Sequence, residues 1–175
     1  MLIQSIIFVI LTAGIIVLSW SSLRDPSSHG FYRFFAFEGI LGLTMLNLPN
    51  WFEDPFSARQ LSSWTLLILS LAVAVHGFYM LKKIGEPDGM IENTTRVVKL
   101  GAYSRIRHPL YASLLIFSWG VFFKSPSLLG GLLTCSIIAF MVATARVEEK
   151  ENINRFGDEY LEYMETTKMF IPFLF

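Results

Sequence analysis

The long apolar runs of this chain are the feature that most limits what it can fold into. The run Leu2–Trp20 has no charged residue in 19 positions, and four further runs begin near Phe34, Ser63, Leu110 and Ser127. A helix of that length spans roughly 28 Å, close to the thickness of a bilayer's hydrocarbon core. Hydrophobic residues make up 53% of the 175 positions and charged residues only 16%. The pattern predicts an all-α, polytopic membrane protein, and the length of the chain leaves no room for an additional soluble catalytic domain.

The runs predict five transmembrane helices in a single domain covering residues 1–175. The fourth run, 110–123, has 14 residues and is short for a span. It forms with the fifth either two spans or a short helical hairpin that enters the bilayer and returns. The predicted divisions are three transmembrane helices within 1–81, a polar loop at 82–109, the hairpin at 110–145 and an amphipathic helical tail at 146–175.

The basic residues predict the orientation of these helices. Twelve of the fourteen Lys and Arg residues fall on one side of the predicted membrane, leaving only Arg59 and Lys124 on the other. Short loops rich in Lys and Arg stay in the cytoplasm. We therefore expect the 82–109 loop and the tail to be cytoplasmic and the N-terminus to lie outside.

The net charge and the cysteine content argue against several other classes of function for this chain. The net charge is zero, so no overall field attracts nucleic acid. Cys135 is the single cysteine, which excludes an internal disulfide and a cysteine-based zinc site. We expect neither a nucleic-acid partner nor a metal.

The first polar segment ends in the motif Arg107-His108-Pro109-x-Tyr111. Proline is favoured in the first turn of a helix, and it holds the preceding residue, His108, in an extended conformation. His108 and Tyr111 therefore flank a helix N-terminus, where free N–H groups suit an anionic ligand group. The alternative is that these residues only anchor the chain at the membrane surface.

The second polar segment, 146–163, continues the fifth run out of the membrane. Ile153, Phe156, Tyr160 and Tyr163 recur at spacings of three and four, which indicates one apolar stripe. Gly157-Asp158 predicts a helix end followed by a new N-cap. The segment is expected to bend and fold back over the cytoplasmic surface, carrying Glu148 and Glu149. The alternative is an ordinary solvated helix face.

Two ionisable residues fall inside predicted spans. Glu38 and His76 both lie near the cytoplasmic ends of their helices. An ionisable residue within the membrane suggests a function, so both are candidate substrate contacts. The alternatives are a structural Glu–His bond or side chains that reach toward the headgroups.

Taken together, the motifs resemble a known family. Gly101-x-Tyr103, Arg107-His108-Pro109-x-Tyr111, Glu148-Glu149 and Phe156-Gly157-x-x-Tyr160 are similar to motifs of the isoprenylcysteine carboxyl methyltransferases, a superfamily that includes the membrane phospholipid methyltransferases. The resemblance runs from Arg96 onward. It implies an enzyme that uses S-adenosyl-L-methionine without a Rossmann domain, and the chain has no Gly-x-Gly-x-x-Gly motif. The cofactor-binding residues it implies are Arg96, Val97, Val98, Tyr103, His108, Pro109, Leu110, Tyr111 and Glu148.

The resemblance also suggests roles in the reaction. Arg146 lies close to the position of an arginine that binds a carboxylate substrate in eukaryotic members. An amine or thiol acceptor must instead lose a proton, and Glu149 or His108 is the candidate base. The implied activity is methyl transfer to a lipophilic small molecule or lipid, with phospholipid N-methylation and small-thiol S-methylation as alternatives. A non-enzymatic membrane scaffold or assembly protein is the alternative of another class.

Overall fold

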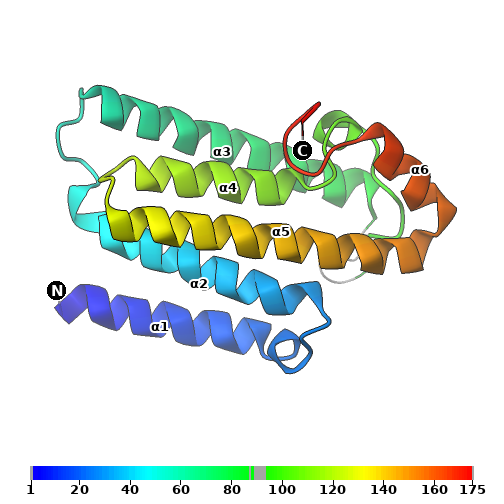
Figure 1. Ribbon diagram of the computed structural model, residues 1–175, viewed down its shortest axis with the longest axis horizontal. Helices are drawn as coiled ribbons and strands as arrows, with labels where there is room; N and C mark the ends of the chain where they lie inside the picture. Colours follow the sequence, from blue (N-terminus) through cyan, green and yellow to red (C-terminus); the bar gives the residue numbers. More distant parts are fainter. Residues whose placement is uncertain (1, 87, 89–93, 175) are drawn as a thin grey trace. The chain divides into compact units, whose positions relative to one another are not determined.

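The computed structural model describes residues 2–86, 88 and 94–174, and most of them are helical (Figure 1). Within these residues the extended pairing is an isolated parallel bridge between Ile106 and Lys168. The all-α prediction is therefore confirmed. The helices are α1 (Leu2–Ser19), α2 (His29–Asn47), α3 (Ala58–Ile84), α4 (Pro109–Phe122), α5 (Leu128–Phe156) and α6 (Asp158–Thr166), with short 3-10 turns η1 (Ser22–Arg24), η2 (Leu48–Asn50) and η3 (Gly101–Ser104).

The second and third helices begin five residues before their predicted starts, because serines preceding them act as caps. The Ser28 side chain accepts a hydrogen bond from the Gly30 amide at 3.2 Å, and the Ser57 side chain accepts one from the Gln60 amide at 3.3 Å. Such bonds satisfy amide groups that have no partner within the helix. A hydrophobic run alone does not show these starts.

The fourth and fifth runs form two helices joined by a short connection, and the second helix continues beyond residue 145, as the polar segment that follows the fifth run predicts. α5 has 29 residues and continues through Phe156. Gly157, with φ +58°, follows its end, and α6 begins at Asp158. The predicted break is confirmed, with Gly157 rather than Asp158 as the N-cap of α6.

The chain divides into two compact units. Unit 1 comprises the residues up to Leu67 together with Leu115–Val147, and unit 2 comprises Ile68–Leu114 together with the residues from Glu148 onward. α3, α4 and α5 each contribute residues to both. The buried apolar side chains of unit 1 are Ala36, Leu43, Val121, Ile137, Met141 and Ala145, and those of unit 2 are Val98, Tyr103, Ile106, Tyr111, Ala112, Tyr160, Tyr163, Met169 and Phe170.

Unit 1 is built from closely packed helices, with α1 alongside α2 (Figure 1). Gly39 permits a close approach between α2 and α5, since a Cβ at this position would lie 2.8 Å from Cγ1 of Ile137. One turn away, the rings of Phe35 and Phe140 stack at 5.1 Å. Packing between apolar helix faces therefore dominates this unit.

Three of the described helices, α1, α3 and α5, are long and apolar enough to cross a membrane. α4 is a shorter apolar helix of 14 residues. The other two predicted spans, and the orientation of the chain, stay predictions.

Unit 2 contains two short segments of the chain that lie side by side without forming a helix. Residues 167–170, which we call the C-terminal strap, run beside residues 105–108. The Lys168 amide donates to the Arg105 carbonyl at 3.0 Å, and the amides of Arg107 and His108 donate to the carbonyls of Lys168 and Met169 at 2.7 and 3.1 Å. Figure 1 shows the strap, in red, beside this green segment. The strap thus fixes the backbone immediately before α4.

Candidate functional site

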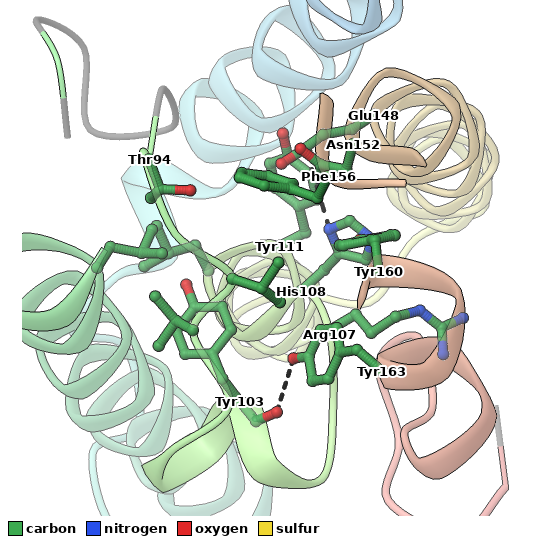
Figure 2. Close-up of a pocket in the computed structure, with 14 residues that line it drawn as sticks. Thr94, Tyr103, Arg107, His108, Tyr111, Glu148, Asn152, Phe156, Tyr160 and Tyr163 are labelled. Carbon is green, nitrogen blue, oxygen red and sulfur yellow. Dashed lines mark hydrogen bonds and ion pairs between the residues drawn. The ribbon is translucent and has the colours of Figure 1, made fainter. Parts of the chain in front are cut away.

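A pocket lies within unit 2, with about 670 Å³ of empty space that includes an opening to solvent. Figure 2 shows aromatic rings and one carboxylate around it. The lining residues are Leu81, Thr94, Val97, Val98, Tyr103, Arg107, His108, Leu110, Tyr111, Glu148, Asn152, Phe156, Tyr160 and Tyr163.

The last turns of α5 form one wall of the pocket. Glu148, Asn152 and Phe156 are spaced four residues apart, so they share a helix face. Figure 2 shows the three side chains leaving the same helix. Asn152 also makes a side-chain hydrogen bond with Tyr160 of α6. The continuation of α5 beyond the predicted hairpin is therefore what supplies this wall.

Tyrosine rings form much of the remaining lining. The Tyr163 hydroxyl donates to the Tyr103 carbonyl at 2.6 Å, which ties α6 to η3 (Figure 2). The rings of His108 and Tyr111 stack, with centroids 5.4 Å apart. Burial raises the pKa of the Tyr103, Tyr160 and Tyr163 phenols well above the ordinary value. These groups consequently stay neutral hydroxyls at physiological pH.

His108 lies between two carboxylates. Its side chain is buried, its Nε2 is 3.3 Å from Oε1 of Glu149 and its Nδ1 is 3.8 Å from Oε2 of Glu148. Within the described part of the chain, this Oε2 is buried and has no hydrogen-bond partner. A buried polar atom is normally paired, so an unpaired carboxylate oxygen in a pocket wall suits a cationic or hydrogen-bond-donating ligand.

Arg107, which also lines the pocket, is the centre of a second polar cluster. Its Nε is 2.6 Å from Oε1 of Glu149, and its Nη1 donates to the Thr167 carbonyl at 2.6 Å and the Met164 carbonyl at 3.3 Å. In Figure 2 the guanidinium points away from the Tyr103 and Tyr111 rings. Arg107 therefore joins α5, the end of α6 and the C-terminal strap, and it engages Glu149 in a buried ion pair.

The structure brings most of the predicted cofactor-binding residues together. Pro109 is buried at the first position of α4, as its place in the motif predicts. The predicted residues that line the pocket are Val97, Val98, Tyr103, His108, Leu110, Tyr111 and Glu148.

Other predicted site residues lie outside the pocket lining. Arg96 is exposed and forms an ion pair with Glu86 at 3.2 Å. Arg146 belongs to unit 1 and is exposed. Part of the predicted 82–109 loop, residues 87 and 89–93, is outside the described residues.

The two predicted substrate contacts have separate partners. Glu38 belongs to unit 1, where its Oε2 accepts a hydrogen bond from the Thr12 hydroxyl at 2.9 Å. His76 belongs to unit 2, where its Nε2 accepts one from the Ala102 amide at 3.2 Å. Each residue thus bonds within its own unit.

Several lining residues were not among the predicted site residues. Asn152 and Phe156 follow Glu148 at helical spacing, so extending one helix face identifies both. Tyr160 and Tyr163 belong to the predicted apolar stripe, which marks them as buried without assigning them to a pocket. Arg107 belongs to the predicted motif without a role of its own, and local spacing cannot indicate its side-chain partners, which are 42 to 60 residues away.

Comparison with known proteins agrees with the resemblance inferred from the motifs. Residues 58–159, more than half of the chain, match the phospholipid methyltransferase family. A 72-residue segment is 31% identical to the methanethiol S-methyltransferase of a Pseudomonas species and 29% identical to methanethiol S-methyltransferase 1 of Bradyrhizobium diazoefficiens. Each match covers 40% of this chain but only 26% and 24% of the two relatives. With its long apolar helices, this chain is an integral membrane protein that belongs to the phospholipid methyltransferase family.

Proposed function

We propose that the chain binds S-adenosyl-L-methionine in the pocket of unit 2 and transfers its methyl group to a lipophilic acceptor. The observation that carries the proposal is the buried Oε2 of Glu148, which accepts no hydrogen bond from the described residues and belongs to a pocket that tyrosine rings also line. A sulfonium or an ammonium group is stabilised by a carboxylate and by the faces of aromatic rings. The donor set therefore fits a cationic cofactor.

The remaining lining fits the other parts of that cofactor. His108 and Tyr111 flank the start of α4, and the N-terminal end of a helix favours a ligand carboxylate. Val97 and Val98 provide an apolar surface for a flat ring. When bound, S-adenosyl-L-methionine would supply a methyl group attached to a positively charged sulfur. A nucleophile that attacks the methyl carbon displaces this sulfur, which leaves as the neutral thioether of S-adenosylhomocysteine.

In this proposal the protein acts mainly by alignment. Direct displacement needs the reacting groups held in line more than it needs covalent help. The buried rings of Tyr103, Tyr160 and Tyr163 restrict water around the reacting groups. A carboxylate acceptor, whose charge disappears in the transition state, would benefit most from this exclusion.

An acceptor that carries a proton needs a base as well. Glu149 already shares its Oε1 with Arg107 and His108, so it is better placed to orient the His108 ring than to take a proton itself. We therefore assign the proton-accepting role to His108, with Glu149 as its positioning partner. Arg146, which the resemblance implies as the ligand of a carboxylate acceptor, is not among the residues that line the pocket. The proposal therefore assigns no residue to bind the carboxylate of such an acceptor.

Methyl transfer to a small thiol is the second candidate. Two relatives that match this chain carry the name methanethiol S-methyltransferase. A thiol becomes nucleophilic when it loses its proton, which the His108–Glu149 pair suits. Transfer of labelled methyl groups to a membrane lipid extract or to methanethiol separates the two, because one product partitions with the lipids and the other is volatile.

Calorimetric titration of the detergent-purified protein with S-adenosylhomocysteine tests the proposal before any acceptor is known. The wild-type protein is expected to bind. Glu148→Gln should bind about 10- to 150-fold more weakly if the carboxylate contacts the ammonium group of this ligand, since a charge-assisted contact contributes roughly 1.5–3 kcal/mol. The matched control is Glu162→Gln, an exposed residue of α6. Absence of binding by the wild-type protein would overturn the proposal and favour the scaffold alternative.

A further inference from the structure

We infer that His76 is a positioning residue, whose ring caps the η3 turn and thereby holds Tyr103 in the pocket wall. The inference rests on the proposed function, because it assigns His76 to the same site. His76 lies on α3, 26 residues before the Ala102 amide that bonds to it. It does not line the pocket, so it acts through the turn.

The hydrogen bond supplies what the turn lacks. The first amide groups of a helical turn have no partner within it and are usually satisfied by the side chain of the N-cap residue. The N-cap of η3 is Leu100, which makes no such bond. The Ala102 amide donates instead to Nε2 of His76 at 3.2 Å. A residue of another helix therefore takes the place of the cap.

Gly101 makes the approach of the ring possible. Its φ is +63°, a conformation that side chains rarely adopt. A Cβ at this position would lie 2.6 Å from Nε2 of His76 and 3.1 Å from its Cε1. The glycine of the Gly101-x-Tyr103 motif is thus needed both for the backbone conformation and for the space that His76 occupies.

The turn transmits this contact to the pocket. Tyr103 is the third residue of η3, its side chain is buried, and its ring lines the pocket. The Tyr163 hydroxyl holds the same residue through its carbonyl at 2.6 Å. Tyr103 is therefore fixed by α6 through its own carbonyl and by α3 through the neighbouring amide.

The test removes the accepting nitrogen and then replaces it. His76→Phe keeps a ring without an acceptor, while His76→Gln places an amide oxygen near the position of Nε2. Tyr79→Phe is the matched control, since it removes a hydroxyl at an exposed position of α3 that bonds to Lys83. The readouts are S-adenosylhomocysteine affinity and the hydrogen-exchange rate of the Ala102 amide.

We expect His76→Phe to weaken binding by about 5- to 10-fold, because the free energy with which a cap orders a turn must then be supplied on binding. The Ala102 amide should exchange severalfold faster in this variant. His76→Gln should restore both values, and Tyr79→Phe should match the wild-type protein. Wild-type affinity in His76→Phe would overturn the inference. A second contradicting result would come from His76→Gln, if its Ala102 amide exchanged at the wild-type rate but the variant still bound as weakly as His76→Phe.

A double-mutant cycle gives a second test, which remains informative if one variant folds poorly. Gly101→Ala should weaken binding and speed exchange of the Ala102 amide more in the wild-type background than in a His76→Ala background, because the clash with the ring is absent in the latter. Equal effects in both backgrounds would contradict the inference. If the wild-type protein fails to bind S-adenosylhomocysteine, the proposed function fails, and the exchange rate of Ala102 still decides whether His76 caps the turn.

Discussion

Among the described residues, unit 1 holds the buried Lys124 and unit 2 the largely buried Arg107, and the two units surround these cations differently. In unit 1 the Lys124 ammonium bonds to Oε1 of Gln60 at 2.9 Å and lies 3.6 Å from the centre of the Trp64 ring. In unit 2 the Arg107 guanidinium pairs with Glu149 and with two backbone carbonyls. The contacts of Lys124 with Gln60 and Trp64 connect helix ends. The partners of Arg107 instead hold together the segments that form a pocket. A buried charge thus contributes to packing in one unit and to a binding site in the other.

Replacing the cation of unit 2 should have the largest effect. Arg107→Met leaves the Glu149 carboxylate buried without its main partner and removes the donor from two carbonyls. We expect a loss of about 3–5 kcal/mol in stability, together with loss of S-adenosylhomocysteine binding. Thermal unfolding in detergent and calorimetry measure the two effects.

The control for this variant is Arg105→Met, which removes an exposed arginine from the same segment. Its stability should change by less than about 0.5 kcal/mol. Equal losses in the two variants would show that the Arg107 cluster does not hold unit 2 together.

Replacing the cation of unit 1 should affect stability alone. Burial lowers the pKa of Lys124 from the ordinary value, so the ammonium is already costly to maintain. Lys124→Met relieves this cost but loses the ring contacts and leaves Gln60 without its donor. The expected net loss is about 1–2 kcal/mol, with unchanged affinity for S-adenosylhomocysteine. A fall in affinity at constant stability would contradict the division of roles between the units.

Loss of one neutral hydrogen bond in unit 2 should have a smaller effect. Tyr163→Phe removes the donor to the Tyr103 carbonyl and should cost about 1 kcal/mol of stability. It should also weaken S-adenosylhomocysteine binding, because Tyr103 loses one of its two supports. An affinity equal to that of the wild-type protein would mean that α6 does not help to position Tyr103.

Alkaline pH should produce the smallest change. The folded-state pKa values of Tyr103, Tyr160 and Tyr163 are raised, so an unfolded chain loses these protons first as the pH rises above about 10. Stability is therefore fully present below that pH and falls above it, by about 0.4 kcal/mol per phenol at pH 10. Unfolding measured at pH 8 and pH 10 should show a smaller difference in Tyr163→Phe than in the wild-type protein.

The sequence allows the elements that carry the site to be predicted, because their signals are local. Pro109 indicates the start of α4, and Gly157 indicates the break before α6. The spacing of Phe156, Tyr160 and Tyr163 predicts that they share a buried face. Glu148 follows from its place in the resemblance and from its position at the end of the fifth run.

The connections between these elements could not be predicted in the same way. The strap pairs residues about 60 positions apart, as the bond from Arg107 to Thr167 shows. Such contacts depend on how the elements pack, which no helical period encodes. The same reason explains why Glu149, adjacent to Glu148 in sequence, bonds to Arg107, and why His76, predicted as a substrate contact, bonds to the backbone of a turn.

The most direct test of the central claim is to locate bound cofactor along the chain. Ultraviolet cross-linking of methyl-labelled S-adenosyl-L-methionine to the purified protein, followed by peptide mapping, reports which residues lie against it. The account predicts label in peptides containing Tyr103 to Tyr111 or Glu148 to Tyr163, and its loss when unlabelled S-adenosylhomocysteine competes. Competed label in peptides of residues 2–67 would contradict the assignment of the cofactor to unit 2.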